Sequence, residues 1–418
     1  MRAIKINYFL GYALMGSVLP YLPVYLRAQD LTNTQVGYIL GMMGIAILLS
    51  PVALTLLADA HLEGKTLLAA VFAASGSALA AMLLVDGFWP IFLVHALFCL
   101  AFVSMMPLQD GLNFQVQAQR QSAGRMTVPY HRVRVWGTVG FILPSLILYL
   151  ALVNGAPIGA ILVVGGAFGL IGMLNTTALP HTRSTPRGGG PASDVPLPTN
   201  NNQPEANNNK PLANGNNRLP TIDALHAMLR PHVLVFCAAM FLAHIANSAY
   251  YAFYPLYLTE QVGVPNEWVG LITNLGVAIE VFFMLGFGLL MARFGIRWLM
   301  AIGIIAMALR MLLLYTWPSV AMAVATQLLH GLHVLVIHVA PPIFLNRQAD
   351  NRYRNSIHGL YAMTVYGVGR IIGAVLGGFI ADISLLAVFG YSALVCAAAA
   401  VLFALFYREP TAQPEVSR

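Results

Sequence analysis

The sequence has few charged residues. Only 9% of its 418 residues are charged, whereas 58% are hydrophobic, and the mean hydropathy is +0.73. Soluble domains carry about 25% charged residues, so a soluble enzyme is excluded. The long apolar stretches between the charges indicate a lipid environment, in which ions cannot be hydrated.

Cysteine is also scarce, and several catalytic motifs are missing. Cys99, Cys237 and Cys396 lie in separate apolar segments without CxxC spacing, which is typical of core residues and predicts no metal site. No GxxxxGKS, GxxxxGKT, HExxH or GxSxG segment is present, so ATP is not the expected energy source. We therefore expect neither an enzyme nor a bound cofactor.

Apolar segments recur along the whole chain. A spanning helix needs about 20 apolar residues, and with that window the sequence predicts twelve helices. The first of them follows Met1 without a small-residue cleavage site, so we expect it to be retained. The predicted ranges are roughly 5–27, 34–58, 66–85, 88–110, 131–153, 157–179, 232–258, 267–291, 297–317, 319–345, 357–381 and 384–407.

One polar break, at 180–220, separates six helices from six. It is rich in Pro, Gly, Ser and Asn, and such a segment cannot bury enough apolar surface to offset its chain entropy. We predict an N-terminal six-helix bundle at 1–179, a largely disordered cytoplasmic linker at 180–231, a C-terminal six-helix bundle at 232–407 and a cytoplasmic tail at 408–418.

The basic residues explain the net charge of +7 and predict the orientation. Nearly all of them lie in alternate loops, and Arg27 is the only one in the loops on the other side. Because cytoplasmic loops carry the excess of Lys and Arg, both termini are expected in the cytoplasm. This placement accounts for the charge, so we expect no nucleic-acid partner.

The two halves also resemble each other. Pro23-Val24-Tyr25-Leu26 ends the first helix of one half, and Pro255-Leu256-Tyr257-Leu258 ends that of the other, 232 positions later. Internal repeats of this kind are typical of secondary transporters. The predicted fold class is an all-α membrane protein with twelve transmembrane helices in two six-helix bundles.

Five charged residues lie inside the predicted spans, where an ion costs several kcal/mol or more and indicates a function. Glu280 and Arg310 share a depth in the membrane and are expected to pair, either as a static bridge or as a pair that exchanges a proton or a substrate contact. Arg370, in a glycine-rich stretch, is expected to be a cavity-facing charge or an interhelical hydrogen-bond donor. By hydropathy alone, Asp110 and Arg134 lie at the inner helix ends, where a surface pair is the alternative.

Histidines add further titratable groups to the tenth helix. His330 and His333 are three residues apart and therefore share one helix face. Imidazole titrates near physiological pH, so they could relay a proton, although they could equally be core histidines. His338 is expected to have a packing role.

Several segments resemble known transporters. The helix count, the six-plus-six division and the loop from Ala58-Asp59 to Gly64-Lys65 resemble the major facilitator superfamily. Val133-Arg134-Val135-Trp136-Gly137-Thr138-Val139-Gly140-Phe141-Ile142 resembles the fifth-helix signature of phenylpropionate permeases and of bacterial nucleoside:proton symporters. Pro107-Leu108-Gln109-Asp110 resembles the helix 4 element of the phenylpropionate permeases, and Glu280 and Arg310 match charged positions in helices 8 and 9 of both families.

This resemblance, together with a more distant one to lactose permease, implies roles for individual residues. Asp110 and Arg134 look like a substrate-binding pair. Gln327 stands where lactose permease has a lysine, and helix 7 carries polar and aromatic residues in place of its aspartates, so lactose is not the expected substrate. The resemblance implies substrate contacts at Asp110, Arg134, Asn247, Tyr250 and Tyr251, and proton coupling at Glu280, Arg310, His330 and His333.

The resulting hypothesis is a proton-coupled symporter. It would import a small organic solute such as an aromatic carboxylate, a nucleoside or a small glycoside by alternating access. A proton-driven exporter of drugs or metabolites is the alternative, and a transporter-like sensor is a third possibility. The expected partners are the solute, protons and the lipid bilayer of a bacterial inner membrane, in which the chain is expected to be a monomer.

Overall fold

Every regular element among the described residues is a helix. The computed structural model describes residues 1–59, 63–180, 219–350 and 352–408. Ten helical runs in these ranges are long and apolar enough to cross a membrane. One of them contains two spans, and α3 adds another, which makes the twelve that were predicted. The predicted fold class, an all-α membrane protein, is therefore confirmed.

The first half of the structure comprises α1 to α7. Its first span consists of α1 and the short α2, and each of the other helices is one span. The bounds are α1 Arg2–Val18, α2 Leu22–Arg27, α3 Asn33–Asp59, α4 Gly64–Met82, α5 Phe88–Ser122, α6 Tyr130–Val153 and α7 Ala160–Asn175.

The second half comprises α9 to α16. Three of its spans contain π-helical segments, which are η2 Tyr257–Gln261, η4 Leu335–Val339 and η5 Ala362–Val368. The 3-10 segment η3 spans Thr326–Leu329. The α-helices are α9 Pro231–Leu256, α10 Asn266–Thr316, α11 Val320–Ala325, α12 His330–Val334, α13 Ala340–Gln348, α14 Arg354–Tyr361, α15 Gly369–Ile383 and α16 Leu385–Phe406.

Two interruptions in the second half have a clear local cause. The 51-residue α10 turns at Gly295, whose φ of 68° is accessible to glycine at little cost, so its two arms form separate spans. The tenth span runs from α11 to α13. Within it, Pro341 has no N–H to donate to the carbonyl of Ile337. The hydroxyl of Tyr366 donates to that carbonyl instead, at 2.8 Å, beside the π-helical segment η4.

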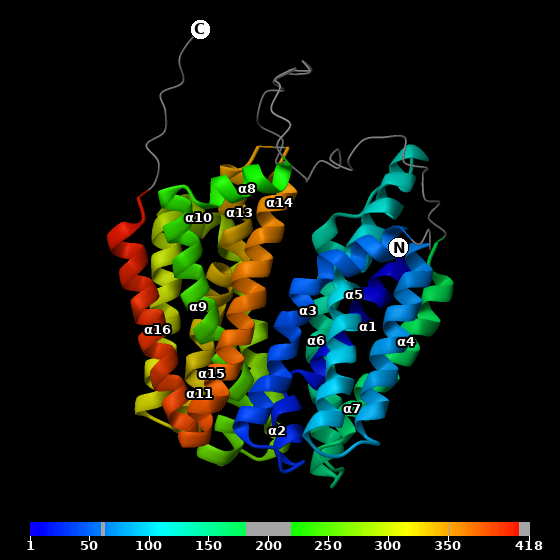
Figure 1. Cartoon of the computed structure of the whole chain (residues 1–418). Coiled ribbons are helices and arrows are strands. Elements are labelled where there is room, and N and C mark those ends of the chain that lie inside the picture. Colours follow the sequence, from blue (N-terminus) through cyan, green and yellow to red (C-terminus); the bar gives the residue numbers. More distant parts are fainter. Residues whose placement is uncertain (60–62, 181–218, 351, 409–418) are drawn as a thin grey trace.

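The halves pack as two bundles that meet along two helix pairs. α1 contacts α6 and α7 in the first half, and α9 contacts α15 and α16 in the second. Between the halves, α3 packs on α15 and α6 packs on α10. Figure 1 shows the N-terminus, α8 and the C-terminal end of α16 at one end of the molecule and α2 and α11 at the other.

One hydrogen bond occurs in both halves at the predicted offset. The hydroxyl of Tyr25 donates to the carbonyl of Met82 at 3.0 Å, and the hydroxyl of Tyr257 donates to that of Leu314 at 2.9 Å. Both tyrosines belong to the tetrapeptides that end the first helix of each half. Because donor and acceptor are displaced together by 232 positions, the contact supports a duplicated six-helix unit.

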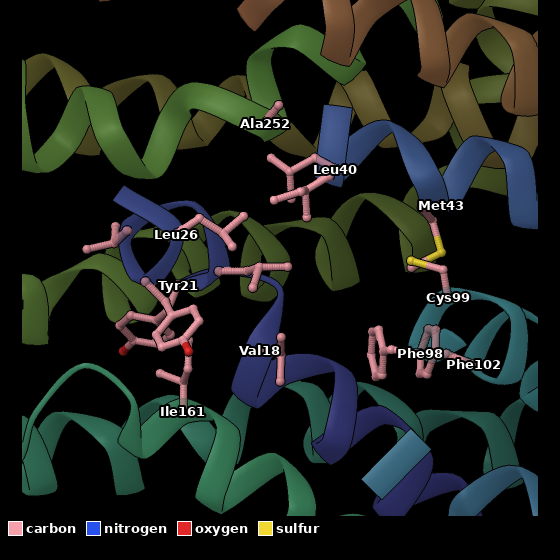
Figure 2. Close-up of a cluster of buried hydrophobic side chains, with 14 of the residues drawn as sticks. Val18, Tyr21, Leu26, Leu40, Met43, Phe98, Cys99, Phe102, Ile161 and Ala252 are labelled. Atoms are coloured by element: carbon pink, nitrogen blue, oxygen red, sulfur yellow. The ribbon is translucent and has the colours of Figure 1, made fainter. Parts of the chain in front are cut away.

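The packed interior of the first half contains Cys99, one of the three cysteines that were predicted to be core residues. Cys99 is fully buried, and Figure 2 shows it beside Met43 and near the rings of Phe98 and Phe102. Those two rings stack with their centroids 5.5 Å apart. Cys237 and Cys396 are also buried and free. The expectation that all three cysteines are core residues is therefore confirmed.

The end opposite the termini holds the two halves together. Asp382, near the end of α15, accepts hydrogen bonds from the backbone N–H groups of Asn33 at 2.8 Å and Thr34 at 3.1 Å. These N–H groups begin α3, where a carboxylate satisfies free donors and the helix dipole. Arg27 and Glu260 form an ion pair of 3.1 Å at the same end. The halves are thus closed against each other there.

A helix occupies the end of the predicted linker. α8 (Pro220–Met228) buries Ala224, Ala227 and Met228 in the core of the second half. Nη1 of Arg352 lies 3.6 Å from Oδ2 of Asp223, which belongs to this helix. The expectation that the linker is largely disordered falls mainly on 181–218, which lies outside the described residues.

The orientation in the membrane remains a prediction, and cysteine labelling tests it. The native cysteines are buried, so new cysteines at the exposed Leu219 and Asn154 can be read separately. If the termini are cytoplasmic, an impermeant maleimide applied to intact cells labels Asn154→Cys and leaves Leu219→Cys unlabelled. The reverse pattern would reject the orientation.

Candidate functional site

Arg310 lies fully buried in the centre of the second half and is held by neutral groups. Its Nη1 is 2.9 Å from Nδ1 of His330, and its Nη2 donates to Oε1 of Gln327 at 2.8 Å and to the hydroxyl of Tyr250. The guanidinium also lies 4.5 Å from the ring centroid of Tyr250. A planar guanidinium can donate in several directions while its face stacks on a ring, which a lysine cannot do.

The groups around Arg310 come from three spans. Gln327 lies in the 3-10 segment η3, whose three residues per turn put it on the same side as His330. Its amide also donates to the hydroxyl of Tyr254 at 2.7 Å, which donates to the carbonyl of Ala323 at 3.1 Å. These hydrogen bonds join α9, the second arm of α10 and the tenth span.

Arg310 determines which nitrogen of His330 carries the proton. A guanidinium only donates, so Nδ1 of His330 is the acceptor, and in the neutral ring the proton lies on Nε2. Nε2 faces Oε2 of Glu280 at 4.0 Å and the hydroxyl of Tyr251 at 3.5 Å. His330 therefore points its proton toward Glu280, whose side chain keeps 24% of its exposure.

The expected direct pair between Glu280 and Arg310 does not form in the described structure. The depth estimate put both charges near the middle of the membrane, but their contacts place His330 between them. Glu280 instead lies within electrostatic range of Arg134, which belongs to the other half of the molecule. The packing of α6 on α10 brings these residues together.

His330 and His333 lie side by side, as their spacing predicts. Their ring centroids are 5.6 Å apart, and Tyr251 packs against both rings. His333 is 1% exposed, and neither of its ring nitrogens has a hydrogen-bond partner among the described residues. Its ring thus keeps both nitrogens without a hydrogen-bond partner in the described part of the chain, next to His330.

Asp110 and Arg134 form the polar centre of the first half, but each contacts tyrosines. Oδ1 of Asp110 accepts from the hydroxyls of Tyr8 and Tyr130, the latter at 2.9 Å. The guanidinium of Arg134 stands over the ring of Tyr12, 4.1 Å from its centroid. No ion pair joins Asp110 to Arg134 within the described ranges, so a direct bridge between the two, as a surface pair would make, is absent.

The predicted substrate-binding residues of α9 divide into two kinds. The hydroxyl of Tyr250 accepts a hydrogen bond from Arg310 and the residue is 2% exposed, so in the described structure it positions Arg310. Tyr251 is only half-buried and contacts His330. Asn247 is 4% exposed, and its Oδ1 lacks a partner among the described atoms. Tyr251 and Asn247 thus keep free polar atoms.

The sequence analysis missed Tyr8, Tyr12 and Tyr130 and the role of Gln327. Tyr8 and Tyr12 are four residues apart in the first helix, a spacing that places them on one face. Tyr254 similarly follows Tyr250 by four. These spacings can be read from the sequence. They do not show that a neighbouring helix places a charged side chain against the tyrosines.

Comparison with known proteins agrees with this fold. The family model described as the MFS_1 like family matches residues 1–391. Nucleoside permease NupG of Escherichia coli is 23% identical over 91% of this chain and 87% of its own length. The E. coli protein named "Probable 3-phenylpropionic acid transporter" is 25% identical over 91% of this chain and 90% of its own. A crystal structure of NupG (D323A mutant) superposes with a TM-score of 0.80 at 21% identity, covering 97% of this chain and 99% of that one.

Replacing Arg310 with lysine tests whether its neutral surroundings depend on the guanidinium fork. An ammonium cannot serve His330, Gln327 and Tyr250 in the same geometry, and a buried acceptor without its donor costs about 1–3 kcal/mol. We expect Arg310→Lys to lower the free energy of unfolding by about 2 kcal/mol, measured by thermal unfolding in detergent. Arg293→Lys, the same change at an exposed position, should leave the free energy of unfolding unchanged. Equal stability of both variants with the wild type would refute this role.

Proposed function

Because the chain belongs to the MFS_1-like family and is a secondary transporter of small solutes, we propose that it is a proton symporter that imports a small organic solute. The proposed pathway lies between the two halves. Glu280 and the neighbouring histidines handle the proton, and Arg134 contacts the solute. An exporter driven by protons in the opposite sense remains the second candidate, because both directions can use a buried acid.

One observation carries the proposal, which is the position of Glu280. It lies 4.0 Å from His330 of its own half and within electrostatic range of Arg134 of the other half. Burial disfavours a charged carboxylate, and a nearby cation favours it. A change in the distance between the halves therefore changes the affinity of Glu280 for a proton, which is the requirement for coupling.

Arg310 supplies a second control on the proton. While it donates to Nδ1, His330 cannot accept a second proton without losing that hydrogen bond. Movement of α12 relative to α10 would free Nδ1 and allow the ring to become an imidazolium next to Glu280. His333, whose nitrogens are free in the described structure, offers the next acceptor.

Replacing Glu280 with glutamine separates proton coupling from a structural role. Glutamine keeps the shape but cannot release a proton, so we expect Glu280→Gln to lose accumulation driven by a proton gradient while exchange of solute across the membrane is largely retained. Uptake into proteoliposomes, with uridine and 3-phenylpropionate as solutes, measures both. Glu267→Gln, the same change near the start of α10, is the control and should accumulate solute normally. Proton-driven accumulation in Glu280→Gln would show that the acid is not the coupling group.

Replacing Arg134 with lysine tests the solute contact. The guanidinium can bind a solute oxygen with its fork while it stacks on Tyr12, and a point charge cannot. We expect Arg134→Lys to weaken solute binding about tenfold or more, since hydrogen bonds to charged groups contribute about 1.5–3 kcal/mol. Arg132→Lys, at an exposed position two residues earlier, is the control. Isothermal titration of the purified variants gives the affinities, and unchanged binding in Arg134→Lys would remove Arg134 from the site.

A further inference from the structure

Arg370 is an intramembrane cation that takes no part in the proton and solute contacts proposed above. It lies in α15, a regular helix that starts directly after the π-helical segment η5. No hydrogen bond or ion pair joins its guanidinium to any residue that the structure describes. A cation without a partner is costly at this depth, so it requires either water or a ligand.

The contacts of α15 fix the direction in which Arg370 points. Gly369, Gly373 and Gly377 lie against α9, where an added Cβ at Gly373 would meet the carbonyl oxygen of Ile245 at 2.2 Å. On a second face, Ala374 and Gly378 lie against α3.

A third face of α15 is exposed. It carries Leu376, Phe379 and Ile383, with exposed fractions of 41%, 48% and 86%, as expected for side chains that meet lipid. At about 100° per residue, Arg370 falls between the face on α9 and the face on α3, nearly opposite the lipid-exposed face. Arg370 therefore points into the interior, between the two halves of the molecule.

The groups near Arg370 come from both halves, and none is a carboxylate. It lies within electrostatic range of Tyr251 and His244 of α9, of His338 of η4, and of His95 and Cys99 of α5. His95 and Cys99 are engaged with each other, with Nε2 and Sγ 3.3 Å apart. None of these groups accepts a hydrogen bond from the guanidinium in the described structure.

Tyr251 supplies a second unused donor. Since Arg310 fixes the proton of His330 on Nε2, the hydroxyl oxygen of Tyr251 is the acceptor in their 3.5 Å contact. Its own O–H is then free, and no other partner for it occurs among the described residues. Arg370 and Tyr251 lie on two helices that pack on each other, within electrostatic range, and each has an unused donor. A carboxylate offers two acceptor oxygens to such donors.

The balance of charged residues within the described spans supports the same assignment. Three arginines, Arg134, Arg310 and Arg370, stand against two carboxylates, Asp110 and Glu280. Arg310 is 0% exposed and already donates to neutral partners. Arg134 has Glu280 nearby. Arg370 is therefore the one of these three arginines that has neither a hydrogen-bond acceptor nor a nearby carboxylate among the described residues.

We propose that Arg370 and Tyr251 form an anion-binding subsite that takes the carboxylate of a small organic acid. This inference rests on the proposed transport function and specifies the chemical class of the solute. It also links the solute to the proton groups, because Tyr251 touches both the subsite and His330. A bound carboxylate would draw the Tyr251 hydroxyl toward itself and so change the surroundings of the proton on His330.

A matched pair of ligands tests the subsite. The probes are 3-phenylpropionate and its uncharged analogue 3-phenylpropanamide, titrated against the purified full-length protein. We expect the wild type to bind the carboxylate about 10- to 100-fold more tightly, the range for a hydrogen bond to a charged group. Arg370→Gln should abolish this preference by weakening only the carboxylate. Arg293→Gln removes the same charge at an exposed position and should keep the preference.

Arg370→Lys covers the case in which Arg370→Gln does not fold. Lysine keeps the charge without the fork, so the carboxylate should bind about tenfold more weakly than to the wild type and still better than the amide. Equal affinity of the wild type for both ligands, or an unchanged preference in the folded Arg370→Gln or Arg370→Lys variant, would overturn the subsite. Proton-dependent uptake of uridine in that situation would leave the proposed transport function in place.

Discussion

A charge in the middle of a membrane protein is stable only where other groups replace its lost hydration. In this protein the groups that replace the lost hydration differ from one arginine to the next. Arg310 is enclosed by neutral acceptors and an aromatic face. Arg134 stacks on Tyr12 and lies within range of Glu280, and Arg370 has no partner among the described residues. This gradation separates Arg310, which is enclosed by its partners, from Arg134 and Arg370, which we propose as solute contacts.

The same constraint connects the charges to the movement of the two halves. Glu280 belongs to one half and Arg134 to the other, so the compensation between them depends on how the halves are placed. The contacts that hold the two halves together at the end opposite the termini are individually weak. An exposed ion pair such as Arg27–Glu260 contributes about 0–1 kcal/mol, and a helix-capping carboxylate such as Asp382 about 1 kcal/mol. Weak contacts at that end and variable compensation at the centre suit a protein that changes between two arrangements.

The sequence predicted the fold well and the pairing of the site poorly. Apolar length and the 232-residue offset are properties of single segments, so the spans, the repeat and the resemblance to major facilitator transporters were all accessible, and the resemblance is confirmed. The chain is a transporter and not an enzyme, as predicted. Partners across helices depend on rotation and register, which depth alone does not give. The direct Glu280–Arg310 pair was therefore wrong, and the roles of Gln327, Tyr8 and Tyr12 were missed.

The central claim is that Glu280 changes its protonation when solute binds. Infrared difference spectroscopy on the reconstituted protein measures this directly, because a protonated carboxyl group has its own carbonyl band. We expect that adding 3-phenylpropionate or uridine changes a carboxyl band in the wild type and that this change is absent from Glu280→Gln. The same band change in Glu280→Gln, or its absence from a wild-type protein that transports the solute, would contradict the account.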